Sequence, residues 1–204
     1  MSTAVGPTPD RTPRTARAQA VVAAARTLLD AEGAEALTMR TLAAQLGVRA
    51  PSLYKHLPDK QALEAALVEE ALVEMGTALH AACDVRPGGA ALGPLLAAYR
   101  ATARRRPHAY RLATVGHLPR ELLPPGLEAW AGAPFVQVAD GDEHLARAIW
   151  SFAHGMVVLE LDGRYPDGAD VDAAWAAGLR AFAGQVGGTW ATVEAGRPEG
   201  ATPP

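Results

Sequence analysis

The sequence predicts an all-α protein, and three observations lead to this prediction. Alanine, the residue with the highest intrinsic helix propensity, dominates the chain. β-Branched residues are sparse, and no alternating apolar–polar run of convincing length marks a strand. Apolar residues instead recur at helical spacing, and we expect about nine helices. The 204 residues are enough for one large or two small domains with real cores.

Composition excludes several classes of protein. The single cysteine, Cys83, allows no internal disulfide and no cysteine-based metal cluster, and we interpret it as a small apolar residue on a helix. No apolar run approaches the roughly 20 residues of a membrane helix, and the polar N-terminus lacks the apolar core of a signal peptide. We therefore expect a cytoplasmic protein with no membrane partner, no metal and no cofactor.

Charge is divided unevenly along the chain, whose formal net charge is −3. Residues 1–60 carry eight Lys and Arg against five Asp and Glu, whereas the remainder carries eleven against seventeen. Because affinity for phosphates depends on cations close to the strand, a basic N-terminal part on an acidic body is compatible with DNA binding. It also predicts that this binding is sensitive to salt.

The N-terminal segment leads into the first helix. Residues 1–13 hold three prolines and a glycine without periodicity, and we interpret them as a disordered arm. Arg11, Arg14 and Arg17 belong either to a solvated tail or to an arm that follows the DNA backbone or enters a minor groove. A helix is predicted from about Thr15 to Glu32, where a glycine ends it. Its apolar stripe is Val21, Val22, Ala25, Leu28 and Leu29.

The stretch from Thr38 to Leu63 has the pattern of a helix-turn-helix. Thr38 can cap the first short helix, because its hydroxyl can accept a hydrogen bond from a free amide. Gly47 can adopt the left-handed conformation that ends a helix in a sharp turn. Apolar residues at helical spacing lie on both sides of this glycine, where the pattern changes phase; they are Leu42, Leu46, Leu53 and Leu57.

The second helix of the pair is predicted from Arg49 to Leu57. Pro51 fits its first turn, where no amide hydrogen is needed. Its outward side chains are cationic, hydroxyl-bearing or aromatic, as a helix in a major groove requires; they are Arg49, Ser52, Tyr54, Lys55 and His56. A polar helix face can also be merely solvated, so the pattern alone leaves two alternatives.

This stretch closely resembles the DNA-binding signature of the tetracycline-repressor (TetR) family. The run T-x-R-x-L-A-x-x-L-G-V-x-x-x-x-L-Y-x-H-x-x-x-K-x-x-L begins at Thr38 and covers about an eighth of the chain. The resemblance implies an all-helical homodimer, with an N-terminal three-helix DNA-binding domain before a helical ligand-binding and dimerisation domain. The DNA-binding residues expected from it are Thr38, Arg40, Arg49, Ala50, Pro51, Ser52, Tyr54, Lys55, His56 and Lys60.

These residues are expected to have different roles. Thr38 and Arg40 would contact phosphates at the start of the first short helix. Arg49 and Ser52 are the candidates for base edges, since arginine suits guanine O6 and N7. Ala50 stands where family members carry a long polar residue, so it offers at most a contact to a thymine methyl group.

A long helix is predicted over about 59–83, where apolar residues alternate with glutamates. Lys60 at its start either reaches a phosphate, as in the family, or is an ordinary surface lysine. The segment from Asp84 to Pro94 is the clearest break between helices. The expected organisation is a disordered arm (1–13), a helix-turn-helix domain (14–60), a C-terminal domain (61–187) and a flexible tail (188–204).

Two features of the C-terminal half allow more than one interpretation. Arg104, Arg105 and Arg106 look like a nucleic-acid patch, but arginines in a last helical turn also complement the helix dipole, and we favour this second interpretation. A proline-rich loop containing Trp130 is typical of a pocket entrance, although the tryptophan could equally lie in the core.

A predicted helix from Glu143 to Leu161 contains Trp150, His154 and Gly155 as W-x-x-x-H-G. It resembles the C-terminal domain of a TetR subgroup named for these residues. A lone histidine on an apolar helix is more often a hydrogen-bonded core residue than a ligand or base. A last helix, Asp170 to Gln185, would pair antiparallel with it, either within the chain alone or, as in the family, against a symmetry mate.

We therefore predict a ligand-responsive transcriptional regulator, most often a repressor in this family, that binds a near-palindromic double-stranded DNA operator as a homodimer. A small-molecule effector would release it. Candidate effector-binding residues are Tyr110, His117, Trp130, Trp150, Phe152 and Met156. One alternative is an enzyme in the C-terminal helices, for which no nucleophile–base–acid set stands at an instructive spacing. The other is an interaction module whose helix-turn-helix binds protein.

Overall fold

The computed structural model describes residues 7–85 and 88–186, and the regular structure of these residues is entirely helical. The all-α prediction is therefore confirmed. The α-helices are α1 (Ala16–Glu32), α2 (Met39–Gln45), α3 (Ala50–Tyr54), α4 (Lys60–Val85), α5 (Leu92–Arg105), α6 (Pro107–Thr114), α7 (Leu127–Val138), α8 (Glu143–Leu161) and α9 (Val171–Ala183). The tail predicted over 188–204 and the first six residues of the arm lie outside the described residues.

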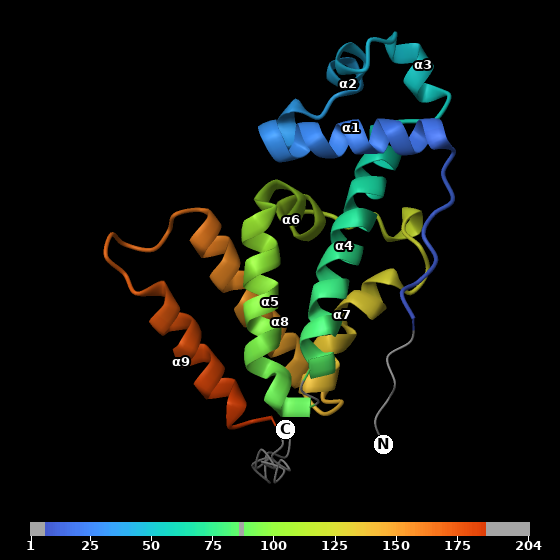
Figure 1. The fold of residues 1–204 in the computed structure, drawn as a ribbon. Coiled ribbons are helices and arrows are strands. Elements are labelled where there is room, and N and C mark those ends of the chain that lie inside the picture. Colours follow the sequence, from blue (N-terminus) through green and yellow to red (C-terminus); the bar gives the residue numbers. More distant parts are fainter. Residues whose placement is uncertain (1–6, 86–87, 187–204) are drawn as a thin grey trace, which may run out of the picture.

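Helices α1 to α3 form a head that lies across one end of α4 (Figure 1). Thr15 caps α1, because its hydroxyl accepts a hydrogen bond from the amide of Ala18 at 3.2 Å. Gly33 ends the helix with φ +82°, a left-handed value that glycine adopts without strain. The predicted apolar stripe is confirmed, since all five of its members are buried in the core of the head.

Helix α4 connects the head to the rest of the molecule. Its 26 residues span about 39 Å at 1.5 Å per residue, and its bounds lie within two residues of those predicted. Leu63 and Leu67 belong to the core of the head, whereas Leu79 and Cys83 belong to a second core. One continuous helix therefore takes part in both cores.

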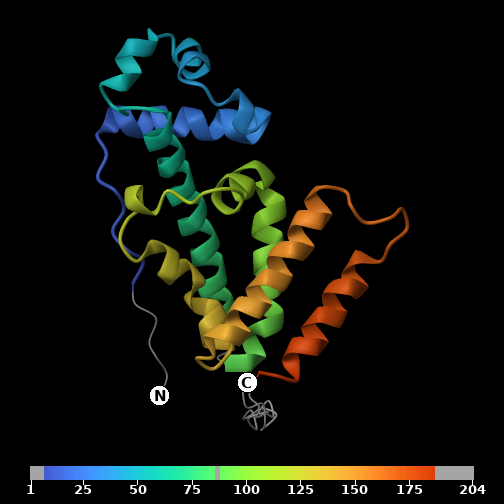
Figure 2. The same cartoon turned by 180° about the vertical axis from the view of Figure 1, so that it is seen from behind.

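Helices α5, α6 and α7 pack against α4, α8 packs against α5 and α7, and α9 lies along the edge of this body (Figure 2). Of the described side chains of α9, only Trp175 is buried. Gly178 of this helix faces Phe152 of α8 so closely that an added Cβ would lie 2.0 Å from the ring. The absence of a side chain at Gly178 thus makes room for this aromatic ring. No described helix is long and apolar enough to cross a membrane.

Arg100 of α5 attaches α9 to the body. Its guanidinium donates two hydrogen bonds to Glu160 of α8, at 2.9 and 3.1 Å, and one to Asp172 of α9, at 2.5 Å. It also lies 5.4 Å from the centre of the Trp175 ring. Burial alone would raise the pKa of Glu160, but the hydrogen bonds from Arg100 and Trp175 outweigh burial and lower it.

Candidate DNA-binding surface and ligand cavity

The turn between α2 and α3 has the conformation that its sequence predicts. The hydroxyl of Thr38 accepts a hydrogen bond from the amide of Thr41 at 3.0 Å, which caps α2. Gly47 has φ +64°, and the amide of Val48 donates to the carbonyl of Ala43 at 2.9 Å. Leu42 and Leu53, on either side of the turn, are buried in the head core. These contacts fix the angle between the two helices of the motif.

Helix α3 is shorter than predicted. The regular helix ends at Tyr54 rather than at Leu57, and the next residues form a turn in which the amides of His56 and Leu57 both donate to the carbonyl of Leu53. Leu57 is buried in the head core and precedes a proline, which disfavours helical geometry for it. Arg49 is the N-cap residue, so its side chain lies at the very start of α3.

The residues predicted to contact DNA keep access to solvent. Ala50, Ser52 and His56 are half-buried, and the other seven are exposed. Among the described residues, no carboxylate lies within 4.0 Å of the cationic groups of Arg40, Arg49 or Lys55. Lys60 does have such a partner, because its ammonium lies 3.1 Å from Glu64 one turn along α4. The cations of the helix-turn-helix are thus mostly available to an external anion.

Arg14 differs from the other arginines near the start of the chain. It forms an ion pair with Glu69 of α4, whose side chain is 2% exposed, and the amide of Thr12 donates to the same carboxylate at 3.1 Å. The end of the segment expected to be a disordered arm is therefore held against α4. Arg11 and Arg17 remain exposed. Arg14 thus has a buried carboxylate partner within the chain.

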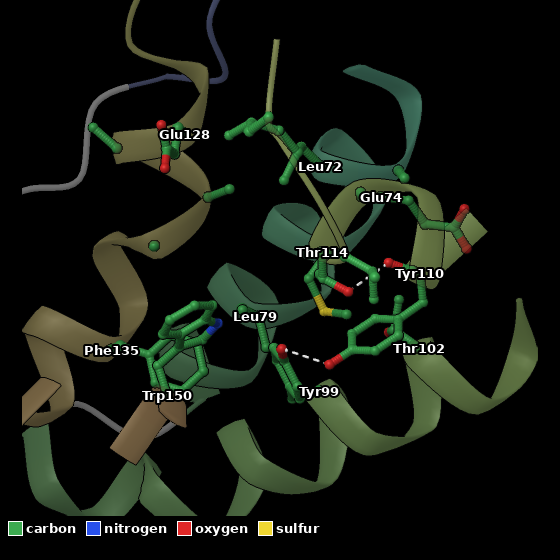
Figure 3. A pocket seen from close by; sticks show the side chains of 18 of the residues that line it. Leu72, Glu74, Leu79, Tyr99, Thr102, Tyr110, Thr114, Glu128, Phe135 and Trp150 are labelled. Carbon is green, nitrogen blue, oxygen red and sulfur yellow. Dashed lines mark hydrogen bonds between the residues drawn. The ribbon is translucent and has the colours of Figure 1, made fainter. Parts of the chain in front are cut away.

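A cavity of about 800 Å³ lies in the body between α4, α5, α6, α7 and α8 (Figure 3). Its volume is in the range of sites that hold drug-sized molecules. Much of the wall is apolar; this part includes Leu72, Met75, Leu79, Leu112, Phe135, Val136 and Trp150. Polar groups come from Tyr99 and Thr102 of α5, Tyr110 and Thr114 of α6, His117 in the segment after α6, and three pairs of charged residues.

Three of the six predicted effector-binding residues line this cavity, namely Tyr110, His117 and Trp150. The other three do not. Trp130 packs against α4, with its ring 4.7 Å from that of His80 and so close to Gly76 that an added Cβ would lie 2.3 Å away. The ring is half-buried and packs on α4, so it does not form a wall of the cavity.

Phe152 and Met156 lie on the other side of α8. Phe152 packs against Trp175 and a second aromatic ring of α9, and the sulfur of Met156 accepts a hydrogen bond from Tyr165 at 3.0 Å. The cavity side of α8 carries Trp150, and residues two apart on a helix point about 200° apart. Phe152 and Met156 therefore belong to the contact between α8 and α9.

Three side chains form a hydrogen-bonded chain in the cavity wall. The hydroxyls of Tyr99 and Tyr110 lie 3.0 Å apart, and that of Tyr110 lies 2.8 Å from Nδ1 of His154 (Figure 3 draws the two tyrosines). Burial raises the pKa of both tyrosines, that of Tyr110 to about 12, and lowers the pKa of His154. All three groups are therefore neutral near pH 7, and His154 is a hydrogen-bonded residue as predicted.

Two charged residues of the wall connect the cavity to the head. Arg106 donates to Glu74 of α4 at 2.7 Å and to Asp30 of α1 at 3.1 Å, and Arg105 donates to Glu74 at 2.8 Å. Burial alone would raise the pKa of Glu74, but the hydrogen bonds from both arginines lower it. Arg104 is paired with Glu160. The arginine run is thus a set of internal ion pairs, and not a nucleic-acid patch.

Sequence reasoning missed Tyr99, Thr102 and Arg106 as wall residues. Tyr99 and Thr102 are spaced i and i+3 on α5 and so share one face of the helix, and Arg106 follows directly after its last residue. This spacing of polar residues on an otherwise apolar face was the signal in the sequence. In the described part of the chain, no three histidine, cysteine or acidic side chains gather where they could hold a metal ion.

A helix-turn-helix head with free cations, joined by one helix to a helical body with a cavity, defines a ligand-responsive transcriptional regulator. Comparison with known proteins agrees. Residues 21–67 match the bacterial regulatory proteins of the TetR family, and residues 92–182 match the tetracyclin repressor-like C-terminal domain. The chain belongs to the TetR family. The second match does not confirm the subgroup named for W-H-G.

Individual relatives show the same relationship. The chain is 32% identical to an uncharacterized HTH-type transcriptional regulator of Mycobacterium tuberculosis, over 77% of this chain and 75% of the relative. It shares its fold with the crystal structure of a possible TetR family transcriptional regulator from Streptomyces coelicolor A3(2), at a TM-score of 0.63 and 20% identity over 82% and 97% of the two chains. A TetR protein of Acinetobacter baumannii AYE in complex with minocycline has a TM-score of 0.59 and 23% identity over 81% and 93%.

Proposed function

We propose that this protein is a repressor that binds a near-palindromic operator as a homodimer in the cytoplasm and leaves it when a small molecule occupies the cavity. One observation carries the DNA-binding part. Arg40, Arg49 and Lys55 have no carboxylate partner among the described residues, whereas the body neutralises most of its arginines internally. The paired arginines of the body are Arg100, Arg104, Arg105, Arg106, Arg111, Arg120 and Arg147.

The exposed side chains of the head suggest how the contacts are divided. Arg40, near the start of α2, is assigned to a phosphate, and Arg49 at the start of α3 to a base edge. Ser52 lies one turn further on the same helix and is the second candidate for base contact. Thr38 is assigned to a phosphate as well, although its hydroxyl already caps α2. Tyr54, Lys55, His56 and Lys60 would position α3 on the backbone, with Pro51 in its first turn and Ala50 against a thymine methyl group.

Dimerisation is assigned to α8 and α9. Leu159 of α8 is 44% exposed, and no atom from another described helix lies within 4 Å of the place where a Cβ would stand at Gly155. The surface of α8 at Gly155 is therefore open to close packing by a helix of a second chain. A symmetric pair of chains would present its two α3 helices to successive major grooves about 34 Å apart.

The decisive experiment measures operator preference. The full-length protein is titrated by fluorescence anisotropy with duplexes from the DNA that flanks its own gene, against random duplexes of equal length. We expect one duplex to bind roughly 10³-fold or more tightly than random sequence at fixed salt. A monomeric protein without preference for any duplex would contradict the proposal and would favour an interaction module or an enzyme.

Arg106 and α6 suggest how the cavity communicates with the head. Arg106 lies in the cavity wall and pairs with Asp30 of α1, and His108 of α6 packs against Gly33 at the end of α1. Ala109 of α6 is buried in the head core. A molecule that displaces the Arg106 side chain would thus alter a direct contact between body and head.

Replacement of Arg106 by methionine should therefore weaken allosteric coupling. In the native protein, an effector found by thermal-shift screening should change operator affinity by about 5- to 150-fold, the usual range of coupling. In Arg106→Met, we expect the operator dissociation constant to change less than about threefold between saturating and absent effector.

Arg120 supplies the matched control for this experiment. It also lines the cavity and forms an ion pair, with Glu128, but this pair does not reach the head. Arg120→Met should retain coupling within about twofold of the native value. Native coupling in Arg106→Met, or an equal loss of coupling in both variants, would show that the ion pair of Arg106 with Asp30 does not transmit effector binding to the head.

A further inference from the structure

The geometry points to one class of effector: an uncharged, largely apolar molecule with a single hydrogen-bonding group that meets the hydroxyl of Tyr99. This inference rests on the proposed function, because it names the kind of molecule that the cavity of the repressor would take. Three features of the wall carry it: its apolar surface, the internal pairing of its charges, and the open end of one hydrogen-bonded chain.

The apolar surface comes mainly from α4, α7 and α8, with Leu112 added by α6. Leu72, Met75 and Leu79 come from α4, Phe135 from α7 and Trp150 from α8. Transfer of apolar surface into such a site is favourable by about 25 cal/mol per Å². Most of the contact area available to a ligand therefore favours the binding of hydrocarbon and aromatic groups.

The charged residues of the wall neutralise one another. They are three acids and three arginines, and they form three ion pairs: Glu74 with Arg106 at 2.7 Å, Arg120 with Glu128 at 2.6 Å, and Arg147 with Glu143 at 2.6 Å. Among the described wall residues, an ionic ligand would find no carboxylate or guanidinium that lacks a partner of opposite charge. Because a buried charge without a partner is strongly unfavourable, the cavity disfavours both anions and cations.

The two pairs with exposed side chains are Arg120 with Glu128 and Arg147 with Glu143, whose side chains are each at least 50% exposed. They belong to the edge of the cavity and to solvent. The pair Glu74 with Arg106 lies deeper, at 27% and 12%, and is also bonded to the head. A charge inside the cavity would therefore have to break a pair that the fold already uses.

Tyr99 is the open end of the chain formed with Tyr110 and His154. A hydroxyl has one hydrogen to donate and two lone pairs to accept. If Nδ1 of His154 accepts from Tyr110, then Tyr99 donates to Tyr110. The indole of Trp150 donates a hydrogen bond to one lone pair of Tyr99, and the other lone pair is free. If Nδ1 carries the proton, the direction reverses and the hydrogen of Tyr99 is free. In both tautomers, Tyr99 retains hydrogen-bonding capacity for a ligand.

Two other hydroxyls near this site, those of Thr114 and Tyr110, are less available. Thr114 donates to the backbone carbonyl of Tyr110 at 2.7 Å, and Tyr110 already bonds two partners. Thr102 lies one turn beyond Tyr99 on α5 and lines the same wall. Tyr99, with Thr102 beside it, is therefore where a single polar group of an apolar ligand would be satisfied.

The test uses four fluorescent probes that share one ring system: pyrene, pyrene-1-methanol, pyrene-1-carboxylate and pyrene-1-methylammonium. Each is titrated into the full-length protein at pH 8 and fixed salt. We expect the methanol to bind at least about tenfold more tightly than either ion, because only the ions lose solvation without gaining a partner. Equal or tighter binding of either ion would overturn the inference, and so would failure of all four probes to bind.

Variants then locate the hydrogen bond. Tyr99→Phe should weaken binding of pyrene-1-methanol by about 3- to 10-fold, the range for one hydrogen bond, and should change pyrene affinity less than twofold. Tyr165→Phe is the matched control, since it removes a tyrosine hydroxyl that bonds Met156 outside the cavity. Equal losses for both probes in Tyr99→Phe would indicate a packing defect, and would refute the role of the hydroxyl.

The same preparations are titrated with the operator. If an ion binds best while the operator is still bound with preference, the inference about the effector fails and the proposed function stands. If the operator preference is absent, the proposed function fails whatever the probes do.

Discussion

Replacement of Arg49 by glutamate should lower operator affinity by roughly 100-fold or more, without changing the melting temperature. Arg49 is the N-cap residue of α3, is exposed and has no carboxylate partner among the described residues. A bidentate contact from arginine to guanine contributes about 1–3 kcal/mol, and a dimer presents the residue twice. The introduced carboxylate would in addition repel the phosphates on both half-sites.

Anisotropy titrations at several salt concentrations would measure this effect. Arg164→Glu makes the same charge change in the turn between α8 and α9 and should leave operator affinity within about twofold of the native value.

Arg40→Ala and Arg49→Ala separate contact to phosphate from contact to a base edge. The first should weaken all duplexes alike and reduce the salt dependence, whereas the second should also relax preference at one base pair of each half-site. An Arg49→Glu variant with native affinity would place the DNA-binding surface elsewhere.

The helix-turn-helix was predictable because its determinants are local. The cap at Thr38, the left-handed Gly47 and the buried pair Leu42 and Leu53 all act within about one or two helical turns, and each has the expected conformation. The end of α3 was misplaced because the helical pattern continues to Leu57, whereas the buried position of that residue and the following proline bend the chain.

The cavity was only partly predictable because five helices build it. Aromatic composition identified Tyr110 and Trp150 correctly but also selected Trp130 and Phe152. The last two pack against glycines of other helices, and the local sequence does not predict which aromatic ring meets which glycine. Periodicity assigns a residue to a face of its helix, but the partner of that face is decided by tertiary packing.

Ion pairs distant in sequence were invisible for the same reason. Glu69 is one of the glutamates that alternate with apolar residues along the long helix, yet it is 1% exposed and bonded to residues 55 and 57 positions earlier in the chain. Arg106 likewise pairs with Asp30, 76 positions away. Both pairs join segments that are far apart in the sequence. The first joins the N-terminal segment to α4, and the second joins the body to the head.

Replacement of Arg14 by alanine should destabilise the protein by about 3–5 kcal/mol, because it would leave the carboxylate of Glu69 buried without its cation. Glu69 lies in the middle of α4 and cannot turn to solvent without moving that helix, which belongs to both cores. The remaining hydrogen bond, from the amide of Thr12, does not supply the missing charge.

Arg17→Ala is the matched variant, since Arg17 is exposed and lies three residues further along, on the first turn of α1. Urea unfolding of both variants should show the loss in Arg14→Ala and a change below about 0.5 kcal/mol in Arg17→Ala. Replacement of the partner, Glu69→Ala, should lower the free energy of unfolding less than Arg14→Ala does. The arginine left behind lies at the end of an exposed segment, so its side chain can turn into solvent. If Arg14→Ala instead kept native stability and lost operator affinity, the arginine would belong to the DNA-binding surface and the contact with Glu69 would be incidental.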